Sequence, residues 1–222
     1  MDIFGRARSV TSHVDGQFVL NAPAGSYTVE LSKDGFVTGY FNVIAGTNKD
    51  DSAMVITPEI PDNEIRIVLV WDEAPADLDS HLTYYVGNEQ ACHLYFPTKE
   101  AVYDGETVAV LDIDQTESYG PETVTITLNA DLLKDGNYFR YSVHDYTNRD
   151  STDSKAMSMS GAFIHIYKGN EEWISPLPIP KNKEGTVWHV FDIVEDENGN
   201  PKLVITDSDD SFYYQMTPSE VE

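Results

Sequence analysis

Three ionisable residues, Asp77, Asp79 and His81, recur at every second position of the segment Asp77-Leu78-Asp79-Ser80-His81-Leu82. Because side chains alternate along a strand, an extended segment places all three on one face. Grouped carboxylates repel one another, and burial makes their charged forms costly. The pattern therefore predicts compensation for these charges, by a cation, by hydrogen bonds from nearby backbone, or by solvent.

A second acidic segment, Leu111-Asp112-Ile113-Asp114, is expected to place Asp112 and Asp114 on one strand face, and Glu122 follows it. Calcium takes about 6–8 oxygen ligands, so two Asp-x-Asp segments brought together would supply most of them. The alternative is that these side chains cap turns and accept backbone N–H groups at a corner of the fold. We expect calcium as the cofactor, and the predicted metal ligands are Asp77, Asp79, Asp112, Asp114 and Glu122.

Histidines offer a different metal chemistry, because imidazole nitrogens with a carboxylate suit zinc. His81 and His93 are expected on neighbouring strands, where they could meet. Spacings typical of metalloproteases are absent, which favours structural, hydrogen-bonded histidines. The alternative function on this basis is a metal-dependent hydrolase at the corner of Asp79, His81 and His93, with His144, Asp112 and Asp145 as further candidates.

Nucleophilic catalysis finds little support in the sequence. No Gly-x-Ser-x-Gly elbow is present. Cys92 precedes His93 directly, and adjacent strand residues face opposite sides, so the two cannot form a Cys–His dyad. As the single cysteine, Cys92 also excludes an internal disulfide. We therefore predict no catalytic residues and no enzymatic activity.

Aromatic residues suggest a binding platform for sugars, since exposed rings stack on pyranose faces. Trp71 and Trp188 each lie in an apolar run and are expected in the core. The predicted ligand-binding residues are Tyr119, Tyr146 and Trp173.

Composition limits the partners of the chain. Its 222 residues carry 38 acidic and 14 basic side chains, a formal net charge of −24. Nucleic-acid backbones require basic surfaces, so nucleic-acid binding is excluded as a function class. No run is long and apolar enough to span a bilayer, which predicts no membrane insertion, and the first residues lack the apolar core of a signal peptide.

Turn dipeptides such as Asp104-Gly105 and Asn198-Gly199 separate short runs of alternating β-branched and aromatic residues, which is typical of an all-β protein. We expect a domain over 1–57 with a strand at 17–21, a linker over 47–63, and a domain over 64–216. The second domain is expected to have nine strands, over 65–71, 80–86, 93–96, 108–112, 123–128, 138–144, 161–167, 186–193 and 202–207. Ser175–Asn182 holds three prolines and is expected as an extended crossing segment rather than a central strand. Asn148–Ser160 is polar and serine-rich, and we expect a mobile loop there.

The first unit resembles a carboxypeptidase regulatory-like domain. The matching residues are Asp15-Gly16-Gln17-Phe18, Pro23-Ala24-Gly25-Ser26-Tyr27-Thr28-Val29 and Gly35-Phe36. This resemblance implies a small transthyretin-like sandwich, of which the earlier strands are missing here.

The second unit is similar to an uncharacterised bacterial surface-protein family, distantly related to pre-peptidase C-terminal sandwiches. The resemblance rests on Trp71 with Asp77 to Leu82, Leu111 to Asp114, Tyr119 to Thr123, Gly136 to Tyr138, Val143 to Tyr146, and Trp188 to Ile193. It implies a jelly-roll-type antiparallel β-sandwich in a larger multidomain protein. The expected function is a non-catalytic, extracellular or cell-surface adhesion module that binds a glycan or a surface protein; a pure structural spacer is a further alternative.

Overall fold

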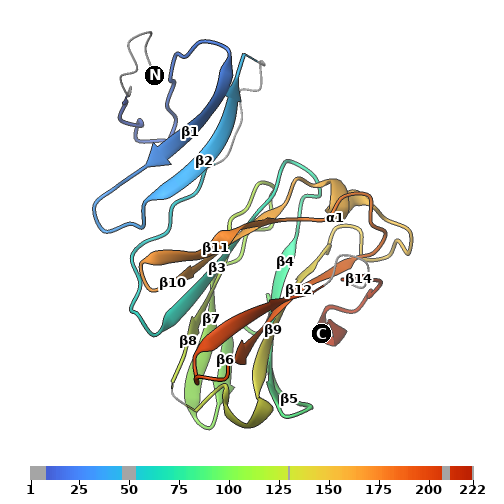
Figure 1. Cartoon of the computed structure of the whole chain (residues 1–222). Coiled ribbons are helices and arrows are strands. Elements are labelled where there is room, and N and C mark those ends of the chain that lie inside the picture. The colour runs from blue at the N-terminus through green and yellow to red at the C-terminus, as the bar shows by residue number, and fades with distance from the viewer. Residues whose placement is uncertain (1–8, 47–53, 130, 207–210, 222) are drawn as a thin grey trace. The chain divides into compact units, whose positions relative to one another are not determined.

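The structure is a computed structural model that describes residues 9–46, 54–129, 131–206 and 211–221. It forms two compact units, Met1–Pro58 and Glu59–Glu222. Nearly all regular structure in the described residues is antiparallel β-sheet, which confirms the all-β class and the sandwich expected from the sequence (Figure 1).

The first unit contains one antiparallel pair in its described part, β1 (Gly25–Leu31) and β2 (Gly39–Ala45). The Tyr27 hydroxyl donates to the Pro23 carbonyl at 2.9 Å and ties the entry of β1 to the preceding turn. No strand forms at residues 17–21, where one was expected. Residues 47–53 of the predicted linker lie outside the described part of the chain.

The second unit is a sandwich of two sheets. The first sheet has the order β11-β10-β3-β8-β7-β6 and the second β13-β12-β9-β4-β5, with β14 paired to β12. The bounds are β3 (Glu64–Val70), β4 (Asp79–Val86), β5 (Glu89–Leu94), β6 (Glu100–Tyr103), β7 (Glu106–Ile113), β8 (Glu122–Thr127), β9 (Tyr138–His144), β10 (Phe163–Lys168), β11 (Glu171–Pro178), β12 (Val187–Glu195), β13 (Pro201–Ile205) and β14 (Phe212–Tyr213).

Strand alternation divides the second sheet into an apolar inner face and a polar outer face. On β9, Phe139, Tyr141 and Val143 are fully buried in the core between the sheets. The alternate residues of β9 form the outer face, where Arg140 and His144 make polar contacts. The polar face is nevertheless buried in part, and His144 has no exposed surface.

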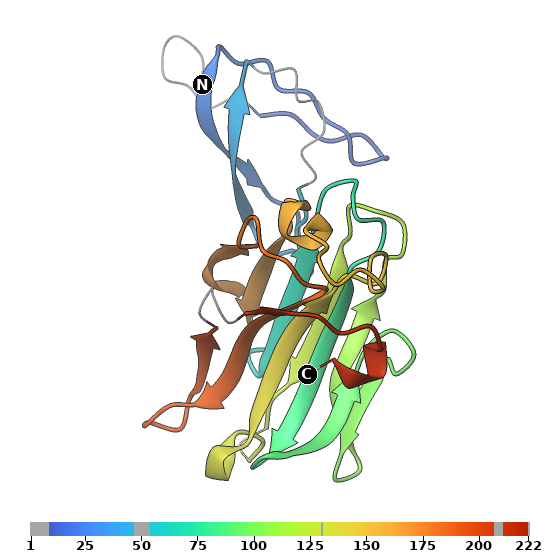
Figure 2. The same ribbon diagram turned by 90° about the vertical axis from the view of Figure 1, so that its right-hand side faces the viewer.

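The segment from Ser211 to Val221 covers part of this outer face. Its first residues form β14, which pairs with β12, and the chain then crosses over β9, as Figure 2 shows. The carbonyl of Gln215 accepts hydrogen bonds from Thr186 Oγ1 and from a ring nitrogen of His144, both at 2.9 Å. We call residues 211–221 the covering segment.

Three strands of the second unit were not expected from the sequence. Strand β6 is short and polar at its start, β14 has two residues, and β11 overlaps the proline-rich segment. Strand β11 lies at the edge of its sheet, where proline is tolerated because no neighbour needs its missing N–H. The polar loop 148–160 contains the short helix α1 (Ala156–Met159), anchored by the fully buried Met157.

Candidate functional site

Two loops are tied together at one end of the sandwich, and they position the acidic residues. The Trp71 backbone N–H donates to the Tyr119 carbonyl, and the Ser118 N–H donates to the Ala76 carbonyl at 2.6 Å. The Trp71 indole N–H donates to the Pro75 carbonyl at 2.9 Å, which fixes the turn before Asp77. The turn that leads into β4 therefore lies against the loop that joins β7 to β8.

This arrangement brings carboxylates of both sheets into one cluster. One oxygen each of Asp79, Asp114 and Glu122 can be chosen so that all lie within 4.8 Å of one another. Asp79 begins β4 in one sheet, whereas Glu122 begins β8 in the other. Asp77 interacts electrostatically with Asp79 and Asp114. We call Asp77, Asp79, Asp114 and Glu122 the acidic cluster.

Each member of the acidic cluster has one buried oxygen without a hydrogen-bond partner among the described residues. These atoms are Asp77 Oδ1, Asp79 Oδ2, Asp114 Oδ1 and Glu122 Oε1. Asp79 and Glu122 are almost completely buried, at 2% and 1% exposure. Unpaired buried carboxylate oxygens are costly and rare, so four in one place indicate a site for a cation.

The partners that the cluster does have are too few to neutralise it. Lys99 Nζ lies 2.7 Å from Asp114 Oδ2. Glu122 Oε2 accepts a hydrogen bond from the backbone N–H of Ser80, which links the two sheets. Arg149 contributes a more distant positive charge that lowers the pKa values of Asp77 and Asp79. Two cations therefore face four carboxylates.

Burial and mutual repulsion make the acidic cluster hard to ionise without a metal. Burial raises the pKa of Asp79 to about 8, and the charges of Asp77 and Asp114 add to this. Burial, with the charges of Asp114 and Asp145, raises the pKa of Asp77 to about 6. Burial, followed by the charge of Asp79, holds the pKa of Glu122 well above its usual range. A bound divalent cation would reverse this balance, because it favours the charged forms.

Two further acidic candidates, Asp112 and Asp145, are not part of the acidic cluster. The Asp112 side chain is exposed and accepts a hydrogen bond from Thr125 Oγ1, so the structure does not bring it into the cluster. Asp145 is buried, but its carboxylate accepts hydrogen bonds from the backbone and side chain of Asn148 at 3.0 Å. Of the five predicted metal ligands, the structure groups Asp79, Asp114 and Glu122, and Asp77 is near enough to interact with two of them electrostatically.

Three histidines line the outer face of the second sheet beside Asp79. His81 Nδ1 lies 2.9 Å from His93 Nε2, and the ring centroids of His81 and His144 are 5.6 Å apart. One ligand atom each of Asp79, His81 and His144 also falls within 4.8 Å of the others. Burial lowers the pKa of His81 well below its usual range and those of His93 and His144 to about 4, so all three imidazoles are neutral at pH 7.

Cys92 takes no part in this histidine group. It packs against the hydrophobic core, whereas His93 contacts His81 on the opposite face of the sheet. Burial also raises the pKa of the Cys92 thiol, which disfavours the reactive thiolate.

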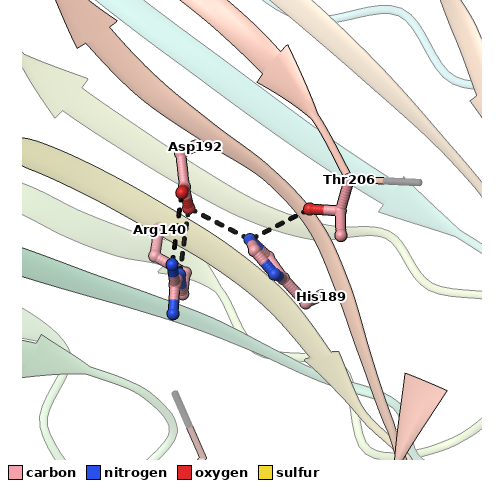
Figure 3. Close-up of polar contacts among 4 residues, drawn as sticks. All are labelled: Arg140, His189, Asp192 and Thr206. Carbon is pink, nitrogen blue, oxygen red and sulfur yellow. Dashed lines mark hydrogen bonds and ion pairs between the residues drawn. The ribbon is translucent and has the colours of Figure 1, made fainter. Parts of the chain in front are cut away.

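A second polar network lies on the outer face of the second sheet, farther along β9 and β12 (Figure 3). Arg140 Nε and His189 Nε2 both lie 3.0 Å from Asp192 Oδ1, and Thr206 Oγ1 lies 3.2 Å from the same nitrogen of His189. A catalytic triad requires the carboxylate and the hydroxyl on different ring nitrogens. Since both lie at Nε2, the network is not a proton relay.

Replacement of Arg140 by Met is expected to raise the pKa of Asp192 and to destabilise the protein at pH 7. Burial of Asp192 opposes ionisation, but hydrogen bonds from His189 and Arg140 outweigh it and lower the pKa. The stabilisation is present above the unfolded pKa of about 4 and is lost at lower pH, so Arg140→Met should cost about 1–2 kcal/mol only at neutral pH. Urea unfolding and NMR titration of the Asp192 carboxyl measure both effects.

Lys134→Met is the matched control for this prediction. Lys134 also contacts an aspartate, Asp131, at 2.6 Å, but both side chains are exposed. Exposed ion pairs contribute little, so no measurable change in stability is expected. Equal effects of the two substitutions would contradict the role assigned to the Arg140–Asp192 pair.

The predicted sugar-binding aromatics lie on separate elements. Tyr119 is in the loop between β7 and β8, Tyr146 follows β9 and carries the guanidinium of Arg149 over its ring, and Trp173 is on β11. Trp173 is partly buried against the hydrophobic core. The three predicted residues thus come from three different segments of the second unit.

No helix in the described ranges is both long and apolar enough to cross a membrane.

No family model and no curated protein sequence matches the chain. Two solved structures are similar to it in fold. A protein of unknown function, SAV2460, has 15% sequence identity and a TM-score of 0.49, with 70% of this chain and 91% of that chain covered. A homologue of the telluride resistance protein TerD, SCO6318 from Streptomyces coelicolor, has 15% identity and a TM-score of 0.48, with 65% and 88% covered.

These findings correct two predictions from the sequence. The resemblance to carboxypeptidase regulatory-like and pre-peptidase C-terminal families was wrong: no family model matches the chain, and the similar solved structures are described as a protein of unknown function and a TerD homologue. The function drawn from it, an extracellular adhesion or glycan-binding module, was wrong for the same reason. Similarity at this level supports no function by itself, so function must be argued from the site.

Proposed function

We propose that the larger unit is a calcium-binding β-sandwich in which the ion joins the two sheets at one end. The observation that supports this is the set of four buried, unpartnered oxygens from Asp77, Asp79, Asp114 and Glu122. Oxygens on opposite sides of a calcium ion, each 2.3–2.6 Å from it, are about 4.6–5.2 Å apart. The 4.8 Å limit on the ligand atoms of Asp79, Asp114 and Glu122 fits this spacing.

Calcium suits the acidic cluster better than magnesium does. Magnesium requires near-ideal octahedral geometry at about 2.0–2.1 Å and usually keeps several waters. The acidic cluster instead offers four protein carboxylates in a buried place, which favours a larger ion with flexible coordination. Four negative charges around one dication, with Lys99 as counter-charge, also favour tight binding.

The location of the site defines what calcium does for the protein. Asp77 and Asp79 lie at the start of β4, whereas Asp114 and Glu122 flank the loop between β7 and β8 in the other sheet. An ion held by both pairs is a cross-link between the sheets, in addition to the hydrophobic core and the bond from Ser80 to Glu122. The calcium-loaded form is therefore the rigid, stable form of the module.

Calcium titration by isothermal calorimetry tests the proposal. The chelator-treated full chain should bind one calcium ion in the acidic cluster, and magnesium should bind more weakly. Asp114→Asn and Glu122→Gln should each reduce calcium affinity by at least about ten-fold, because each removes a charged ligand.

Asp112→Asn is the matched control, since it removes the same charge two residues from Asp114 at a side chain bonded to Thr125. Its calcium affinity should stay within about two-fold of the parent, as expected for an exposed charge. The proposal fails if the parent chain shows no heat of calcium binding, or if Asp112→Asn and Asp114→Asn weaken calcium binding equally.

A further inference from the structure

Strand pairing places two histidines next to Asp79, a member of the acidic cluster. Asp79 on β4 lies directly opposite His144 on β9, and His81 is two residues farther along β4 on the same face. Diagonal neighbours of this kind are within reach of long side chains. Strand β5 is the other neighbour of β4. Its His93 pairs with Thr83, so it is a diagonal cross-strand neighbour of His81 on the same face.

Each of these three side chains has a buried polar atom without a partner in the described part of the chain. The atoms are Asp79 Oδ2, His81 Nε2 and His144 Nδ1. His81 and His144 are 1% and 0% exposed, so no solvent compensates. One ligand atom of each of Asp79, His81 and His144 lies within 4.8 Å of the others, so the three side chains are grouped rather than scattered.

The hydrogen bond of His144 shows which of its nitrogens is free to bind a metal. Its Nε2 lies 2.9 Å from the carbonyl oxygen of Gln215 in the covering segment. A carbonyl only accepts, so Nε2 carries the proton and Nδ1 has an open lone pair. A metal ligand held through its other ring nitrogen by a carbonyl is the usual arrangement of metal-binding histidines.

His81 has the same arrangement with a different partner. Its Nδ1 is bonded to His93 Nε2, so one of the two nitrogens donates. If His81 Nδ1 donates, His81 Nε2 presents a lone pair; in the other tautomer it presents a buried N–H without an acceptor. A metal at Nε2 selects the first tautomer, and His93 then acts as a positioning residue that accepts from His81.

We propose that Asp79, His81 and His144 form a second metal site, for a borderline transition-metal ion such as zinc, which shares the Asp79 carboxylate with the calcium site. Two imidazoles and one carboxylate, with water in the fourth position, suit tetrahedral zinc. Ligands at about 2.0–2.1 Å from a tetrahedral ion are about 3.4 Å apart. The side chains therefore need to close by no more than about 1.4 Å from the 4.8 Å limit.

Zinc titration by calorimetry of the chelator-treated full chain, without calcium, tests this site. We expect one zinc ion that depends on both histidines. His144→Gln and His81→Gln should each weaken zinc binding by at least about ten-fold, because each removes a ligand. His189→Gln is the matched control: His189 lies on the same face of the sheet, but its Nε2 contacts Asp192 and Thr206. Its zinc affinity should be unchanged.

These experiments test the two proposed sites separately, because each substitution affects one metal only. Asp114→Asn should lose calcium and keep zinc, whereas His144→Gln should lose zinc and keep calcium. Zinc X-ray absorption of the parent chain gives a readout that needs no variant: two imidazoles and an oxygen at about 2.0–2.1 Å are expected. The proposal is overturned if the parent binds no zinc, if its zinc spectrum lacks two imidazoles, or if zinc affinity survives both histidine substitutions.

Discussion

Asp79→Asn is expected to stabilise the calcium-free protein by about 2–4 kcal/mol at pH 8 while removing most of its stabilisation by calcium. The folded pKa of Asp79 is about 8, far above the unfolded value of about 4. For such a group, stability is fully present below the unfolded pKa and is lost as pH rises through the folded pKa. Because Asn cannot ionise, the variant avoids that loss.

The pH dependence separates this effect from a general gain in packing. In chelator, the parent chain should lose stability steadily as pH rises from about 4 to 8, whereas Asp79→Asn should show a flatter profile. Urea unfolding at several pH values measures the difference. Equal profiles of stability against pH for parent and variant would mean that ionisation of Asp79 does not destabilise the folded protein.

Calcium should stabilise the parent chain far more than Asp79→Asn. At a calcium concentration about 100 times the dissociation constant, the parent should gain about 2.7 kcal/mol, which corresponds to about 5–10 °C in Tm for a chain of this size. Asp79→Asn lacks a charged ligand and should gain much less. A thermal shift of the same size in both proteins would contradict the assignment of Asp79 as a ligand.

Gly120→Ala is expected to destabilise the protein by about 2–4 kcal/mol and to weaken calcium binding. Gly120 has a φ of +72°, and an added Cβ would lie 2.9 Å from both the Leu69 carbonyl oxygen and the Trp71 ring. The left-handed backbone costs about 1–2 kcal/mol for alanine, and the steric overlap adds a similar amount. Glu122 follows two residues later, so a shift of this loop displaces a calcium ligand.

Gly105→Ala is the control for the backbone contribution. Gly105 has a similar φ of +81°, but an added Cβ there meets no atom within 4 Å. It should cost about 1–2 kcal/mol and leave calcium affinity unchanged. If thermal unfolding shows equal costs for both substitutions, close packing at Gly120 does not position the acidic loop.

Much of the sandwich follows from local sequence pattern. Strand β9 has the predicted bounds, Tyr138–His144, because its apolar and polar residues alternate without interruption. Most other strands begin or end within a few residues of the expected position. The last predicted strand, 202–207, corresponds to β13, and residue 207 lies outside the described part. Strands β6 and β11 lack that alternation. They form because they pair with β7 and β10, and this pairing cannot be read from their own sequences.

At the candidate site, simple side-chain alternation does not predict which face of β7 each aspartate occupies. The sequence placed Asp112 and Asp114 on one face because they are two residues apart. In the structure, Leu111 pairs with Val124 and Ile113 with Thr123, so β7 has one extra residue and its alternation shifts at this bulge. Asp112 therefore faces Thr125, whereas Asp114 reaches Asp79.

Residues that reach the site from distant segments could not be found from spacing. Lys99 precedes β6, and Gln215 lies more than 70 positions after His144, yet each contacts a candidate ligand. Gln215 contributes only its backbone carbonyl, for which no residue type is diagnostic. The pairing of β4 with β9 places His144 opposite Asp79, and this pairing depends on the whole sandwich.

The prolines of β11 bear on self-association as well as on topology. Edge strands expose unpaired N–H and C=O groups, and these recruit strands from other molecules into intermolecular sheets. Pro176 and Pro178 remove two donors from the eight residues of β11, the outermost strand of its sheet. Together with a formal net charge of −24, this edge should resist strand-by-strand aggregation even at high protein concentration.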